Sequence, residues 1–290
     1  MTQVLAAIVT DAEHMPSLIY SLEQKLRVGR YHSEAPATSP GVGAASPVDG
    51  DVWGLGYYQD MHALTVRKPG GLLPSRSLYE FAESARSRIL LTVVDAMHRA
   101  SLDLEQPFRF RHWLFSAIGD FSSLAQGGST IRDRLPGYIK SDFHDADPSA
   151  LAFAVVLREL HARGLVSDPL VDGSSVAETF KHASETIAML AKEGGAELSA
   201  RLFLSNGRLL LASSLGSRLH YRRQDGLEIQ DAPFATKLDP SHLASTLKNF
   251  RAVVLEAGFL SNEDAQRSGF STLDPGKVLL VDRRMTPEVR

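Results

Sequence analysis

The sequence predicts an α+β protein, and the order of its expected elements is the main reason. Apolar, partly β-branched segments typical of strands come first, two long helical segments follow, and further strand segments close the chain. No internal repeat and no linker-like composition separates these blocks. We therefore expect residues 1–290 to form a single domain in which sheets flank or sandwich helices.

In the first half of the chain, the expected elements are mostly strands. Gln3–Val9 is continuously apolar and partly β-branched after its first residue, which predicts a buried, central strand close to the N-terminus. Residues 11–26 carry leucines on one stripe and predict a helix, whereas Tyr31–Gly50 is rich in Ala, Ser, Pro and Gly and predicts a long loop. A helix is expected after Ser77, and further strands are expected at residues 52–58, 63–68, 88–95 and 111–119.

In the second half of the chain, capping residues mark the helices. Asp147 suits the N-cap of a helix, Pro148 its first turn and Gly164 the position just past its end. Asn206 and Gly207 between two apolar runs predict a hairpin with a type I′ turn. A second long helix is expected at residues 174–195, a late helix at 241–258 and a final strand at 277–282.

The composition excludes several functional classes. The 290 residues carry a net charge of −3, so we expect neither nucleic acid nor an anionic membrane as a partner. The chain has no cysteine, and its histidines show no paired spacing, so we expect no metal and no cofactor. The longest apolar run, Ala150–Leu157, is too short to span a bilayer, and the N-terminus lacks a basic region typical of a signal peptide. We therefore expect a cytoplasmic protein.

Four stretches, taken in order, resemble one family: the class II (type-2) glutamine amidotransferases, which are N-terminal-nucleophile hydrolases. The resemblance is strongest to the small stand-alone branch of that family and spans most of the chain. It implies one type-2 amidotransferase-like domain with a four-layer αββα sandwich. The stretches are DGDVWGLGYYQD, RILLTVVDA with EQPFRFRHWLFSAIGDF, DADPSALAFAVVL and RLFLSNGRLLLASS.

The resemblance also implies a mechanism, and this sequence departs from it at most positions. In the family, a cysteine after the initiator methionine attacks glutamine, its own amine acts as base, and an Asn and a Gly bind the oxyanion. An Arg and an Asp hold the substrate. Here the nucleophile position holds Thr2, the oxyanion Asn position Ile118 and the Arg position Val94, with Thr92 in place of a nearby histidine. Only Gly119 of the oxyanion pair remains.

The count of asparagines supports this interpretation without any alignment. The chain contains three, at Asn206, Asn249 and Asn262. None precedes the predicted hairpin, so no asparagine of the first two hundred residues can serve an oxyanion hole. We expect Thr92, Val94 and Ile118 to fill the former substrate pocket together.

Other candidate residues each have a simpler explanation. Asp147 is the retained acidic residue and could bind a ligand amine, but an N-cap in front of Pro148 is enough to explain an Asp there, and we favour the cap. Arg109 and Arg111 alternate on one expected strand face and, with Arg99, could bind an anion; a solvated or ion-paired face is the alternative.

Glycines and tryptophans in the matched stretches have structural explanations as well. Trp53 and Trp113 are expected in the core. Gly54, Gly56 and Gly119 are expected where backbones approach closely.

Two functional hypotheses follow. The first is a catalytically inactive amidotransferase-like protein that acts by binding, either as a regulatory or scaffold protein with another protein as partner or as a sensor of a small ligand. Its function would then lie on the outer surface, at Tyr31–Gly50 or at Arg109 and Arg111. The second is an amide hydrolase in which Thr2, exposed by removal of Met1, is the nucleophile.

Overall fold

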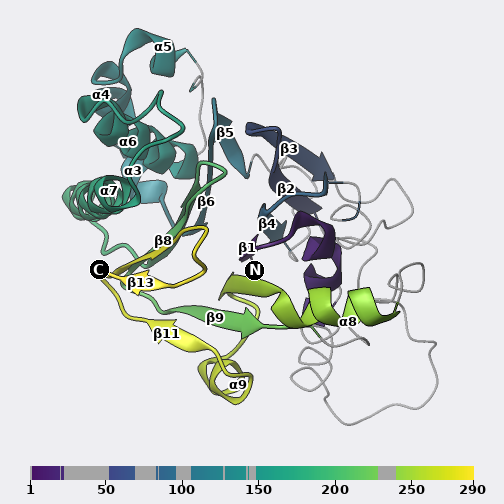
Figure 1. Cartoon of the computed structure of the whole chain (residues 1–290). Coiled ribbons are helices and arrows are strands. Elements are labelled where there is room, and N and C mark those ends of the chain that lie inside the picture. Colours follow the sequence, from purple (N-terminus) through teal and green to yellow (C-terminus); the bar gives the residue numbers. More distant parts are fainter. Residues whose placement is uncertain are drawn as a thin grey trace.

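Two antiparallel sheets packed face to face form the centre of the molecule (Figure 1). The computed structural model describes residues 2–19, 21–22, 52–68, 83, 85–95, 106–126, 128–141, 143, 148–227 and 240–290. Ser77, Arg99, Asp147 and the Tyr31–Gly50 segment lie outside these residues.

The first sheet has seven strands in the order β11-β9-β10-β1-β4-β2-β3. Strand β1 is the middle one, antiparallel to β10 on one side and to β4 on the other. The expectation of a central, buried first strand is therefore confirmed. The strands are β1 (Thr2–Val9), β2 (Val52–Gln59), β3 (His62–Lys68), β4 (Ile89–Asp95), β9 (Leu219–Asp225), β10 (Arg251–Ala257) and β11 (Ser271–Leu273).

The second sheet has six strands in the order β13-β12-β8-β7-β6-β5. The hairpins β5–β6 and β7–β8 pair through β6 and β7, so this sheet is also antiparallel. Its strands are β5 (Phe108–Phe110), β6 (Trp113–Gly119), β7 (Ala200–Ser205), β8 (Leu210–Leu215), β12 (Val278–Val281) and β13 (Glu288–Val289).

Helices cover the outer face of each sheet, which gives the αββα order of layers (Figure 1). One hydrophobic cluster joins the six-stranded sheet to α3 (Ser122–Gln126), α4 (Gly128–Asp133), α5 (Gly137–Lys140), α6 (Pro148–Ala162) and α7 (Gly173–Glu193). A second joins the seven-stranded sheet to the segment after η1 (Ala12–His14), to α8 (Pro240–Asn249) and to α9 (Asn262–Arg267). The third cluster fills the space between the sheets.

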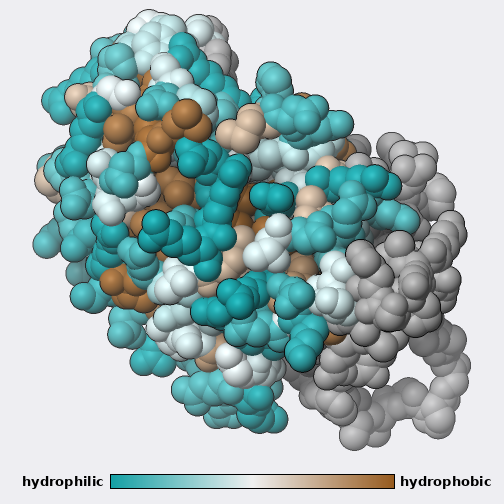
Figure 2. Space-filling view, viewed as in Figure 1, coloured by the Kyte–Doolittle hydropathy of each residue, from teal (hydrophilic) through white to brown (hydrophobic). Residues whose placement is uncertain are grey.

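The two long helices occupy nearly the ranges that the sequence predicts. Helix α6 ends before Gly164, whose φ of 72° is left-handed, and the Leu165 N–H donates to the Leu160 carbonyl at 2.8 Å. Asp172 is the N-cap of α7 and accepts from the Ser175 N–H at 2.9 Å. Within the described part of the chain, no helix is long and apolar enough to cross a membrane. The face drawn in Figure 2 is mostly hydrophilic, with hydrophobic residues gathered mainly over the helices drawn at its upper left.

The expectation of one helix over residues 241–258 is wrong in its second half. Helix α8 ends at Asn249, and the chain continues as β10 between β9 and β1. Val253 and Leu255 face the other sheet, whereas Ala252 and Val254 face the helices. A short run that is apolar on both faces fits a central strand as well as a buried helix, and pairing with β1 decides between them.

The hairpin at Asn206 is confirmed, but its type I′ turn is wrong. Four residues, 206–209, separate β7 from β8, and Gly207 alone among them has a positive φ, of 83°. The Asn206 side-chain oxygen accepts from the Arg208 and Leu209 N–H groups at 3.0 and 2.9 Å. This side chain holds a longer turn than the two-residue loop that the sequence suggested.

Gly54 marks a close backbone approach, as expected of a glycine in this strand. A Cβ at this position would lie 2.0 Å from the Gln106 backbone oxygen and 2.9 Å from Pro107 Cδ. The Gln106 side chain in turn accepts from the Ala117 N–H at 2.8 Å and donates to Ser149 Oγ at 3.3 Å. The contact therefore links β2 of the seven-stranded sheet to β6 of the six-stranded sheet and to helix α6, which packs on that second sheet.

We predict that Gly54→Ala lowers the free energy of unfolding by about 2 to 3 kcal/mol, because backbone atoms must move to admit the methyl group. Gly137→Ala is the matched control, since a Cβ there meets nothing within 4 Å. Urea unfolding followed by far-UV circular dichroism and by tryptophan fluorescence measures both variants. We propose that the chain is one cooperative unit, so both probes should report the same loss; a second, separate transition would contradict that.

Candidate functional site

The position of the family nucleophile lies at one end of the sandwich, where β1 begins. Thr2 is partly exposed and pairs with residue 95 at the end of β4. The end of β6 at Gly119 and the beginning of β7 at Ala200 pair with each other in the second sheet. The end of β10 leads into Gly258 beside β1. We call this region the Thr2 end.

The backbone of the loop that follows β10 lies directly against the start of β1. Gln3 Nε2 donates to the Gly258 carbonyl at 3.0 Å. Gly258 has a φ of 89°, and a Cβ there would lie 3.1 Å from the Thr2 carbonyl oxygen. The space beside Thr2 is therefore partly taken by the backbone of another strand connection.

Ile118, at the position of the oxyanion asparagine, is part of the hydrophobic contact between the sheets. It packs against the inter-sheet cluster that includes Val4 and Ala257. Its neighbour Gly119 has a φ of 151°, and a Cβ there would lie 2.7 Å from Ala200 Cβ. Backbone geometry alone thus requires glycine at 119, independently of any oxyanion.

The expectation that Thr92, Val94 and Ile118 fill one pocket is wrong. Val93 of β4 faces the inter-sheet cluster, whereas Val94 packs against the cluster under the outer helices. Thr92, two residues before Val94, shares its face because side chains alternate along a strand. Only Ile118 of the three points between the sheets.

Arg201 is a cation at the Thr2 end that the sequence analysis did not single out. It pairs with Ile118 across β6 and β7, and its neighbours Ala200 and Leu202 face the helices, so Arg201 faces the other sheet. Its Nε donates to the Arg218 carbonyl. Burial lowers the pKa of the Arg201 guanidinium, and the nearby charge of Glu256 opposes that shift.

A buried polar network lies next to the Thr2 end, beneath helix α9. His220 Nδ1 lies 2.5 Å from Glu256 Oε1, and His220 Nε2 lies 3.1 Å from Asn262 Oδ1. The other Glu256 oxygen accepts from the Phe259 and Leu260 N–H groups at 3.0 and 3.3 Å. The network fixes the loop that follows Gly258, so it positions the backbone beside Thr2.

Arg109 and Arg111 do not share a strand face, contrary to expectation. Strand β5 ends at Phe110, and Arg111 has a φ of 53° in the turn to β6. Arg109 Nη1 donates to the Ala63 carbonyl at 3.2 Å, whereas the Arg111 guanidinium lies 5.0 Å from the centre of the Tyr138 ring and donates to Ser167. The two cations therefore serve separate structural contacts.

Both tryptophans of the matched stretches lie in strands. Trp113 is fully buried and donates to the Val166 carbonyl at 3.0 Å, which confirms a core position. The backbone of Trp53 lies in β2. In the described residues, no group of three or more His, Asp or Glu side chains could hold a metal ion.

Comparisons with known proteins give structural likeness only. No protein-family model matches the chain, and no curated protein matches its sequence significantly. A glutamine aminotransferase class-II domain protein from Silicibacter pomeroyi superposes with a TM-score of 0.53 at 14% identity, covering 99% of this chain and 98% of that one. Glutamine phosphoribosylpyrophosphate amidotransferase from B. subtilis superposes with a TM-score of 0.52 at 8% identity, and the match covers 99% of this chain but 48% of that longer one. The fold is therefore that of the class II glutamine amidotransferases.

We predict that Ile118→Asn lowers the free energy of unfolding by about 1 to 3 kcal/mol, because it places an amide without partners against an apolar cluster. Ile118→Val is the control and should cost about 0.5 to 1 kcal/mol. Thermal and urea unfolding measure both. Equal stability of the asparagine variant and the wild type would mean that position 118 is open to water.

We predict that Glu256→Ala costs about 3 kcal/mol or more, since it leaves His220 and two backbone N–H groups without their acceptor. Glu263→Ala on the exposed side of α9 removes the same charge and should change stability little. A double-mutant cycle with His220→Ala tests the pair. Additive losses would show that the two side chains are not coupled.

Proposed function

We propose that this chain, which has the fold of the class II glutamine amidotransferases, acts by binding and does not hydrolyse glutamine. The single observation that carries the proposal is the placement of Ile118. Hydrolysis of an amide through a tetrahedral intermediate needs hydrogen-bond donors aimed at the oxyanion, and loss of one such donor costs about 3 to 4 kcal/mol of transition-state stabilisation. An isoleucine side chain packed between the sheets donates no hydrogen bond.

The three asparagines offer no substitute for the missing donor. Asn206 lies in the β7–β8 turn at the other end of the sandwich. Asn262 begins α9, where its side-chain oxygen lies 3.1 Å from Nε2 of the buried His220 and so holds the amide against that network. Asn249 ends α8, just before β10 begins at Arg251 beside the far end of β1. None of them stands beside Thr2 on the face that Ile118 occupies.

The bound species is part of the proposal. Without the family arginine in β4, the half-buried Arg201 is the cation that could meet an anionic group at the Thr2 end. A free amino acid brought there would also need a partner for its amine, and the retained acidic residue, Asp147, lies outside the described residues. We therefore favour a protein partner or a small ligand other than glutamine.

The alternative, a hydrolase with Thr2 as nucleophile, has one point in its favour: Thr2 is partly exposed. Its hydroxyl would need a free α-amine as base, which requires removal of Met1. Mass spectrometry of the N-terminus decides that requirement directly.

We predict no release of ammonia from millimolar glutamine above background, and no change on Thr2→Ala. Glutamine should also leave the melting temperature unchanged. Ammonia release that Thr2→Ala abolishes would establish the hydrolase. A stabilising shift with glutamine that Arg201→Gln removes would instead identify a glutamine-binding protein, and either result would overturn the proposal.

A further inference from the structure

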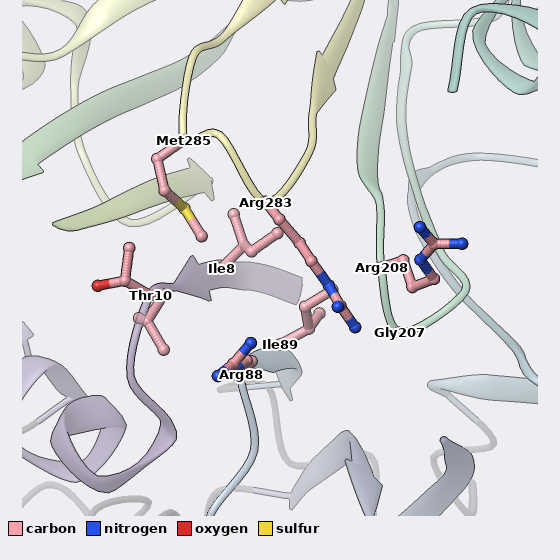
Figure 3. A pocket seen from close by; sticks show the side chains of 9 residues that line it. Ile8, Thr10, Arg88, Ile89, Gly207, Arg208, Arg283 and Met285 are labelled. Atoms are coloured by element: carbon pink, nitrogen blue, oxygen red, sulfur yellow. The ribbon is translucent and has the colours of Figure 1, made fainter. Parts of the chain in front are cut away.

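Three arginines line one cavity at the end of the sandwich opposite to Thr2. Arg88 precedes β4, Arg208 lies in the β7–β8 turn and Arg283 follows β12. Together with the last residues of β1 they line a cavity of about 70 Å³ (Figure 3). Figure 3 shows Arg283 extending from its loop into the space between Arg88 and Arg208, whereas the Arg208 guanidinium points away from the other two. The site lies roughly 20 Å from Thr2, given the length of an eight-residue strand.

Hydrogen bonds fix the backbone that carries each arginine. The Arg208 N–H donates to Asn206 Oδ1 at 3.0 Å. Arg88 lies between Ser87, whose hydroxyl is bonded to the Ile89 carbonyl at 2.6 Å, and strand β1, where the Val9 N–H donates to the Arg88 carbonyl at 2.9 Å. These anchors fix the backbone positions from which the Arg88 and Arg208 side chains extend.

Arg283 is held in the same way. Its turn is closed by the Met285 N–H, which donates to the Asp282 carbonyl at 3.0 Å. The Met285 side chain is buried in the cluster between the sheets, so the turn is anchored to the core.

The cavity has one sign of charge. Its lining contains three arginines and no carboxylate. Across the residues that the structure describes, none of these three guanidinium groups lies within ion-pair distance of an Asp or Glu, whereas neighbouring Arg284 and Arg290 face Asp282 and Glu288 at 3.9 and 2.9 Å. Like charges gathered without counter-charges in a chain of net charge −3 favour an anion as the missing partner.

A second cavity, of about 360 Å³, shares Arg208 and Arg283 with the first. It is also lined by Gly173 and Ser174 of α7 and by the exposed Leu170, and, unlike the first cavity, by the carboxylates of Asp172, Asp282 and Glu288. These carboxylates disfavour a second anionic group there, so the second cavity suits an uncharged, hydrogen-bonding body of a small molecule whose anionic group occupies the first cavity.

We propose that the cavity formed by Arg88, Arg208 and Arg283 binds a phosphate group, either free or as part of a small metabolite. A phosphate dianion matches the planar guanidinium group, which can donate two parallel hydrogen bonds to it. Three arginines exceed what a single carboxylate needs, which favours phosphate over a carboxylate. The site is separate from the Thr2 end and does not depend on the function proposed for that end.

Isothermal titration and thermal unfolding test the site with inorganic phosphate, with glycerol phosphate as an organic monoester, and with chloride at matched ionic strength. Phosphate should raise the melting temperature and bind, and chloride should do neither. Arg208→Gln and Arg283→Gln should each weaken phosphate binding about tenfold or more, and the double variant should abolish it. Arg267→Gln on α9, which removes the same charge from an exposed ion pair, should bind like the wild type.

The possible results of these titrations distinguish phosphate binding from its absence. Tighter binding of glycerol phosphate than of inorganic phosphate would place the ligand body in the second cavity, and equal binding would point to free phosphate; both support the proposal. Absence of a phosphate effect beyond that of chloride would overturn it. Unchanged binding in the double variant would also overturn it, provided that this variant unfolds in chloride at the wild-type temperature.

Discussion

Burial of both faces of β1 is the constraint on which the rest of the structure depends. From Val4 to Val9 no side chain is more than 2% exposed, and the strand is paired with β4 and β10 on its two edges. One face holds the two sheets together and the other holds the outer helices. The middle of the strand is thus entirely used by packing and backbone pairing, so a ligand can meet β1 only at its two ends.

At the Thr2 end, packing and chemistry compete for the same positions. An oxyanion hole needs donors that remain open to a substrate, whereas the space between two sheets is most stable when it is filled by apolar side chains. Ile118 fills the space between the sheets with an apolar side chain at the position where an oxyanion hole would need an amide. The glycine beside it is required by backbone geometry in either case, so its retention says nothing about catalysis.

Local patterns predicted the elements that are locally determined. Strand β1, helices α6 and α7 and the hairpin around Asn206 follow from apolar runs and capping residues close together in the chain. The sequence predicts helix at residues 251–257 because a short apolar run fits both structures, and only pairing with a strand some 250 positions earlier makes this segment β10. Arg111 does not share a strand face with Arg109, because the positive φ of Arg111 itself ends β5 at Phe110.

The site residues missed by the sequence analysis share the same cause. Arg88, Arg208 and Arg283 come from three segments far apart in the chain, and each alone is an ordinary surface arginine. Like charges that lie near one another repel, so each uncompensated pair weakens the folded state a little. Turns held by Asn206, Ser87 and Asp282 keep these charges together against that repulsion. A bound anion would reverse the sign of this contribution, making the arginine end of β1 more stable when it is occupied than when it is empty.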